Sequence, residues 1–282
     1  MVAAGDIAQL GFLAINPTTP PDVVEALLRH PDSGLRRRLA GRADLSHDQL
    51  LELAADRSVE VRTAVSVHPD LTEPERAGIA IDVTLDEADG HFGPRHRCHW
   101  SNAFQHVYHR VVPLADAVRW ADSVNPLLRR RAARHPELPA DLAASLVDDP
   151  DLGVRVLLAL YHPDAPPELL LRCYRQYLGC GREMMAELPQ FPTGGLASFA
   201  DSGDPAERLL ALRDPLAGPE LVAWLCTDAD AAVWQAAAAC ARLPVARIVE
   251  LLDDSELAEH AAANPALPAD RMDRIVETVT AG

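Results

Sequence analysis

The residues best suited to chemistry are concentrated in one segment, residues 91–110. Five of the chain's 11 histidines and one cysteine lie there. His106 and His109 are three residues apart, so they would share one face of a helix. His96 or Cys98, across a short turn, could complete a site, because imidazole and thiolate groups are the usual ligands of zinc. These four residues are the candidate metal ligands, and zinc is the candidate cofactor.

A second interpretation of this segment needs no metal. Its spacing matches no established zinc motif, and carboxylates that could support the ligands are not evident. The segment would then be a loop whose aromatic residues pack on the protein while its histidines face water or a partner. Trp100 and Tyr108 are its candidate partner-binding residues. A further cysteine pair, Cys173 and Cys180, has no additional ligands nearby and is more simply explained by packing.

Short polar residues recur along the chain at intervals close to 26 and predict the starts of helices. Their side-chain oxygens can accept hydrogen bonds from the free N–H groups of a helix start. Prolines that follow would end one short helix and begin the next. The predicted helix-capping residues are Asp6, Asp32, Ser58, Thr84, Asn125, Asp151, Asp204, Asp230 and Asp254.

An arginine stands four residues after most of these capping positions. These arginines at constant phase are Arg36, Arg62, Arg129, Arg155, Arg182 and Arg208. Each guanidinium could bond a carbonyl or carboxylate of a neighbouring unit, which would make the row a structural ladder, or the row could receive acidic peptides or phosphates. The structural role is favoured because the arginine belongs to the repeating pattern itself. Arginines outside this phase are the candidates for a partner surface, namely Arg37, Arg38, Arg130, Arg131 and Arg134.

The units resemble the leucine-rich repeat variant family. Its motif is a capping Asp, an apolar residue before Arg, small or apolar residues, Asn/His-Pro-x-Leu-Pro and a leucine-rich helix. The likeness is closest at residues 61–71, 128–139 and 261–268 and covers nearly the whole chain except residues 85–110. The resemblance implies paired short helices stacked into a right-handed superhelix related to HEAT and armadillo repeats. We therefore expect an all-α fold, a right-handed alpha-solenoid of about ten two-helix repeats of 24–27 residues. It would form a single domain over residues 1–282, with one His-rich insertion at about 85–110.

Composition restricts the function further. The net charge of −16 argues against a nucleic-acid partner, because phosphate backbones are bound by concentrated positive charge. All 26 basic residues are arginine, so lysine-dependent chemistry is excluded. We expect no signal peptide and no membrane span, and five irregularly spaced cysteines suit a reducing cytoplasm.

Three functions remain open, and no catalytic residue is assigned. The first is a non-enzymatic scaffold that binds a protein or peptide partner on the solenoid surface. The second is a metal-dependent regulatory or enzymatic role of the His/Cys-rich insertion. The third is nucleic-acid binding of the HEAT-like kind, which the acidic charge disfavours. The identity of the partner and the oligomeric state are not predicted.

Overall fold

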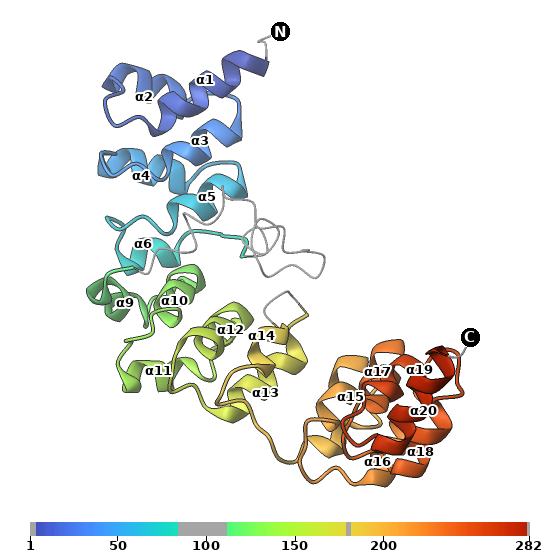
Figure 1. The fold of residues 1–282 in the computed structure, drawn as a ribbon. Coiled ribbons are helices and arrows are strands. Elements are labelled where there is room, and N and C mark those ends of the chain that lie inside the picture. The colour runs from blue at the N-terminus through green and yellow to red at the C-terminus, as the bar shows by residue number, and fades with distance from the viewer. Residues whose placement is uncertain (1–3, 84–111, 179–181, 281–282) are drawn as a thin grey trace. The chain divides into compact units, whose positions relative to one another are not determined.

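The structure is a computed structural model that describes residues 4–83, 112–178 and 182–280. Over these ranges the chain is all helical, with 18 α-helices, one 3₁₀ helix and no strand (Figure 1). The all-α class predicted from the sequence is thus confirmed. The helices group into two compact units, Met1–Phe191 and Pro192–Gly282, so the single continuous domain stays a prediction.

The first unit contains 12 of the described helices. They are α1 (Ala4–Ile15), α2 (Pro21–Leu28), α3 (Ser33–Leu39), α4 (His47–Ala54), α5 (Val59–Val65), α6 (Glu73–Ala77), α9 (Leu114–Trp120), α10 (Pro126–Ala133), α11 (Ala140–Leu146), α12 (Leu152–Tyr161), α13 (Pro167–Gln176) and α14 (Arg182–Ala186). Within this unit α1, α3, α5, α10 and α12 follow one another along one side, and α2, α4, α6, α9 and α11 along the other (Figure 1).

The second unit is smaller and is built in the same way. Its described elements are the 3₁₀ helix η1 (Leu196–Phe199), α15 (Pro205–Ala211), α16 (Pro219–Leu225), α17 (Ala231–Ala238), α18 (Val245–Leu251), α19 (Ala258–Ala262) and α20 (Ala269–Thr280). Here α17 packs against α15, α16 and α19, and α18 packs against α19.

Most of the predicted capping residues begin a helix. Asp32, Asn125, Asp151, Asp204 and Asp230 each accept a hydrogen bond from a backbone N–H in the first turn of the helix that follows. We call the helices that follow the capping positions, α3, α5, α10, α12, α15, α17 and α19, the motif helices. Two capping predictions fail, because Asp6 lies inside α1 and the Ser58 side chain makes no capping hydrogen bond. Thr84 lies outside the described residues.

The motif helices are short, so their packing must supply most of their stability. In the first unit α3 packs between α1 and α5, and α10 packs against α9 and α12. Apolar side chains three and seven residues after the capping residue face the core: Leu35 and Leu39 in α3, and Leu128 and Ala132 in α10, are at most 2% exposed. This spacing of four residues places both side chains on one helix face.

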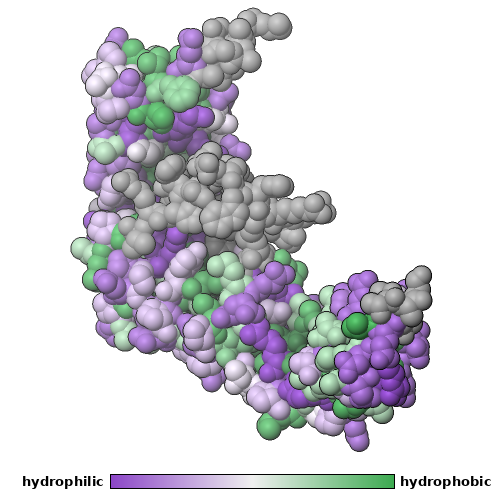
Figure 2. Space-filling model, viewed as in Figure 1, coloured by the Kyte–Doolittle hydropathy of each residue, from purple (hydrophilic) through white to green (hydrophobic). Residues whose placement is uncertain are grey.

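The surface carries no extended apolar face in the view of Figure 2. Hydrophobic and hydrophilic residues are interspersed over the visible face of each unit (Figure 2). Single large hydrophobic residues such as Leu216 and Trp224 are exposed, which is common on protein surfaces. None of the helices within the described ranges combines the length and apolar character that crossing a membrane requires.

Candidate functional site

The arginine row holds the start of each motif helix. In five units the Nη1 atom of the arginine donates a hydrogen bond to the backbone carbonyl six residues earlier, just before the capping residue. The pairs are Arg36 with His30, Arg62 with Asp56, Arg129 with Ser123, Arg155 with Asp149, and Arg208 with Ser202. Arg182 is an exception: it donates to the Tyr174 carbonyl and lies 4.5 Å from the centroid of the Tyr174 ring.

Three arginines of the row also form bidentate ion pairs with an aspartate 20 residues later. The pairs are Arg36 with Asp56 (2.7 and 2.9 Å), Arg129 with Asp149 (2.6 and 3.1 Å), and Arg208 with Asp228 (2.7 and 2.7 Å). Each aspartate also accepts the N–H of the next capping residue, two positions further on. The row therefore links the beginnings of consecutive motif helices and is occupied by contacts within the chain.

These ion pairs change the acidity of the aspartates. Hydrogen bonds from Arg36 lower the pKa of Asp56, and those from Arg208 lower the pKa of Asp228, although burial opposes both shifts. A backbone N–H bond to each carboxylate lowers the pKa further. The carboxylates are thus held in their charged form, as expected for charge-assisted bonds.

A second row of hydrogen bonds joins the turns that follow the motif helices. His68, His162 and Asn264 stand at equivalent positions and are at most 4% exposed. One polar atom of each accepts the backbone N–H two residues later. The other meets a carbonyl 24 to 26 residues earlier: His68 Nε2 meets Arg42 O at 2.8 Å, His162 Nε2 meets Leu138 O at 3.0 Å, and Asn264 Nδ2 meets Ala238 O at 2.7 Å.

The sequence carried a signal for these turn residues. Each is the Asn or His before the proline of the repeat motif, but its role as a link between successive turns was not predicted. Because a carbonyl can only accept and a backbone N–H can only donate, each histidine must be neutral with its proton on Nε2. Asn264 satisfies both demands with one amide group.

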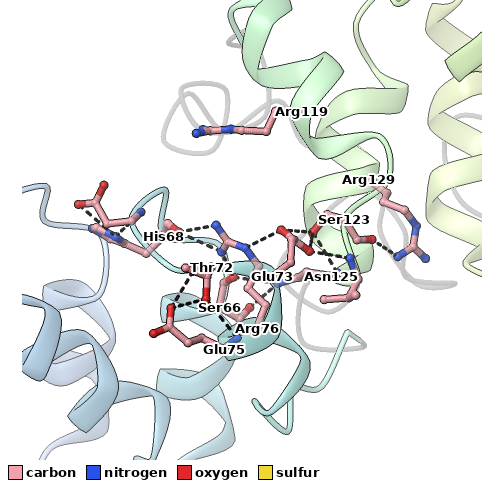
Figure 3. A network of polar contacts seen from close by, with 12 residues as sticks. Ser66, His68, Thr72, Glu73, Glu75, Arg76, Arg119, Ser123, Asn125 and Arg129 are labelled. Carbon is pink, nitrogen blue, oxygen red and sulfur yellow. Dashed lines mark hydrogen bonds and ion pairs between the residues drawn. The ribbon is translucent and has the colours of Figure 1, made fainter.

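A polar network joins the helices on either side of residues 84–111 (Figure 3). Glu73 in α6 accepts hydrogen bonds from Ser123 Oγ at 2.9 Å and from the N–H of Val124 at 2.8 Å. Asn125 Nδ2 donates to Ser66 O at 3.1 Å. Residues before and after the predicted insertion are therefore in direct contact.

Arg76 is the buried centre of this network. Its Nε atom donates to Glu73 at 3.0 Å, and its Nη atoms donate to the carbonyls of Ser66 and His68. Burial lowers the pKa of Arg76, Glu73 opposes this, and the positive charges of Arg119 and Arg131 lower the pKa further. These three guanidinium groups are therefore close enough to repel one another.

Two arginine–aromatic clusters lie beside this network, on α9, α10 and α12. The Cζ atoms of Arg119 and Arg131 are 5.7 and 6.0 Å from the centroid of the Trp120 ring. The Cζ atom of Arg134 is 4.9 Å from the centroid of the Tyr161 ring, and Tyr161 is 38% exposed. We call these five residues the arginine–aromatic surface. Only Arg131 and Arg134 were predicted as site residues, since the other three lie on separate helices that the sequence alone does not bring together.

The structure separates the other predicted partner residues. Arg130 does not lie on the surface: it is 3% exposed, bonds the Asp151 carboxylate at 2.7 and 2.9 Å, and packs over Gly153. Its assignment to a partner surface is corrected accordingly, because a buried paired guanidinium cannot meet a partner. Arg37 and Arg38 are exposed on α3, where the Arg38 side chain passes Gly11 of α1.

The remaining site predictions fall outside the described residues. They are the candidate metal ligands His96, Cys98, His106 and His109 and the aromatic residues Trp100 and Tyr108. Within the described ranges, no group of three or more His, Cys, Asp or Glu side chains could hold a metal ion. Cys173 is buried, and burial raises the pKa of its thiol to about 11, which makes it unreactive.

Comparison of the chain with models of protein families, with curated proteins and with solved structures gave no match.

Proposed function

We propose that this chain is a right-handed alpha-solenoid of the leucine-rich repeat variant type, with about ten repeats of 24–27 residues. In this proposal it acts as a non-enzymatic scaffold that binds a protein or peptide partner. Support for the repeat architecture comes from hydrogen bonds between equivalent turns at separations of 24 to 26 residues. Packing of successive motif helices, α3 on α5, α10 on α12 and α15 on α17, points the same way.

The observation that carries the functional proposal is the contrast between two sets of arginines. The row arginines follow the repeat and bond carbonyls and carboxylates of the chain itself. Arg119, Arg131 and Arg134 do not follow it and instead lie against aromatic rings at the side of the stack. Repeat proteins carry their specificity on such positions, because the repeating residues are committed to packing. Arginine and aromatic residues are also those most enriched where binding energy is concentrated.

Capture with quantitative mass spectrometry tests this proposal. The bait would be the full chain, its Arg131→Glu/Arg134→Glu variant, and an Arg29→Glu/Arg274→Glu control with the same change in charge. Arg29 and Arg274 are exposed and make only surface ion pairs, so their loss should matter little. We expect a partner that the wild type and the control retain and the Arg131/Arg134 variant loses, and that binds again when both proteins are purified. Retention of every captured protein by all three baits would refute the proposed surface.

A further inference from the structure

The arginine–aromatic surface is continuous across two turns of helix α10. Arg131 and the C-terminal capping residue Arg134 are three positions apart, and Arg134 keeps helical backbone angles. Both side chains therefore project from one face of α10. Arg131 reaches Trp120 of α9, while Arg134 reaches Tyr161 at the end of α12. The two clusters thus form one strip that crosses three helices.

The local charge of this strip is opposite to that of the chain as a whole. The chain carries a net charge of −16, yet Arg119 and Arg131 lie on one indole ring near the buried Arg76. The acidic groups beside them are already engaged: Glu73 bonds Arg76, Ser123 and Val124, and Asp116 bonds Arg119 at 2.9 Å. An incoming anion would relieve the repulsion among the guanidinium groups.

Trp120 adds an unmet hydrogen-bonding requirement at the same place. The residue is 7% exposed, and its indole Nε1 is buried without an acceptor in the part of the chain that the structure describes. An indole N–H can only donate, so the missing group must be an acceptor. A buried donor without an acceptor is costly, which makes the position unusual unless a ligand or a partner completes it.

The arrangement of the guanidinium groups favours carboxylates as the anions. A guanidinium that lies on an aromatic ring keeps its planar donor edge free to bind a carboxylate in a bidentate manner. Nucleic acids require a longer track of positive charge to offset their phosphates, and an acidic protein opposes their approach. The aromatic rings can also cover apolar side chains next to an acidic residue.

We propose that the arginine–aromatic surface formed by Arg119, Trp120, Arg131, Arg134 and Tyr161 binds an acidic segment of a partner protein. This inference rests on the proposed scaffold function and names the chemistry of the partner. The segment would place carboxylates on Arg131 and Arg134, which are one helical turn apart, and bring a carboxylate oxygen to the indole N–H.

Binding of a fluorescein-labelled oligoglutamate peptide to the full chain, followed by fluorescence anisotropy, tests the inference. We expect saturable binding that weakens as salt rises, because exposed charges are screened. Arg131→Glu/Arg134→Glu should raise the Kd by about tenfold or more, since it replaces attraction by repulsion at two contacts. Arg29→Glu/Arg274→Glu should leave the Kd within about twofold, because its charges lie elsewhere.

Further arms guard against a folding defect and against a nucleic-acid ligand. Arg131→Gln/Arg134→Gln keeps side chains of polar character without charge and should weaken binding less than the glutamate variant, with an unchanged circular dichroism spectrum. No binding by the wild type, or equal loss in the Arg29/Arg274 control, would overturn the inference. So would tighter binding of a labelled DNA oligonucleotide that the peptide cannot displace.

The two proposals fail in different ways. If the capture experiment yields a partner that depends on Arg131 and Arg134 but oligoglutamate does not compete with it, the scaffold stands and the acidic segment is rejected. If oligoglutamate binds as expected and no protein partner depends on these arginines, the surface binds anions but the scaffold proposal is rejected.

Discussion

At the scale of single residues, the same side chain does two different jobs in this protein. Arg208 is clamped by the Asp228 carboxylate and the Ser202 carbonyl, so its charge is used within the chain. Arg134 lies on the exposed Tyr161 ring. The difference follows from position: four residues after the capping residue, a guanidinium can reach back to the turn that precedes the helix.

Asp228→Asn should make the second unit less stable at neutral pH and less sensitive to acid. Because Arg208 lowers the folded-state pKa of Asp228, the unfolded chain takes up the proton first, at a pH near 4. The stability that the carboxylate contributes is therefore complete above that pH and is lost as pH falls through the folded-state pKa. Urea unfolding between neutral pH and pH of about 3 should show the two proteins converging as pH falls.

The matched control is Asp253→Asn, which changes an exposed aspartate of the same unit. It should follow the wild type across the pH range. A constant gap between Asp228→Asn and the wild type would contradict the ion-pair explanation.

His162 offers a test of the turn row. His162→Ala removes the bond to Leu138 O and the acceptor for the Asp164 N–H, and leaves buried groups unpaired. We expect a loss of about 1–3 kcal/mol in the free energy of unfolding. His162→Asn should cost less, because Asn264 fills the equivalent position with one donor and one acceptor. Equal losses in the two variants, measured by urea unfolding, would show that imidazole packing matters more than the hydrogen bonds.

Sequence reasoning could identify charged positions but not their depth. Arg130 and Arg131 are neighbours outside the arginine row, and both were assigned to a partner surface. Consecutive residues of a helix point about 100° apart, so Arg130 turns inward while Arg131 turns towards Trp120. The pocket for Arg130 is created by Gly153 and Asp151 of the next motif helix, and nothing in the sequence near Arg130 indicates it.

At the scale of elements, the starts of helices were predictable because they depend on local chemistry. Asp32, Asn125 and Asp151 all cap a helix, as their side-chain oxygens allow. Asp6 fails because α1 begins before it, and an aspartate in the first turn of a helix is favourable without being the cap. The contacts between helices depend on residues more than 20 positions apart, so the sequence pattern predicted that they exist but not which atoms make them.

Gly153→Ala tests how closely two motif helices approach. A Cβ atom at this position would lie 2.3 Å from Arg130 Nε and 2.6 Å from Arg130 Cζ. The guanidinium would have to leave Asp151, and a buried charge would lose its partner. We expect a loss of about 3 kcal/mol in the free energy of unfolding, the lower end of what breaking a buried ion pair costs.

Gly203→Ala is the control for this substitution. No atom lies within 4 Å of a Cβ built at Gly203, and the backbone there does not have a positive φ. Its free energy of unfolding should change by less than about 0.5 kcal/mol. A similar small effect for Gly153→Ala would mean that Arg130 can move aside and that the pair with Asp151 contributes little.

At the scale of the whole molecule, the division into two units has a consequence for folding. The second unit, Pro192–Gly282, has its own hydrophobic core, in which Val222, Leu225, Val233 and Ile248 are at most 1% exposed. Its polar links, such as Arg208 with Asp228 and Asn264 with Ala238, also lie within the unit. A segment that contains both its core and its hydrogen-bond partners has the properties of an independently folding domain.

We therefore expect residues 192–282, produced alone, to fold. The fragment should show a helical circular dichroism spectrum and a cooperative urea transition, because stacked repeats are stabilised by their nearest neighbours. Asp228→Asn should lower the transition midpoint of the fragment and of the corresponding phase in the full chain by similar amounts. A fragment that is unfolded, or that unfolds without a cooperative transition, would show that contacts with the first unit are required and that the chain is one cooperative array.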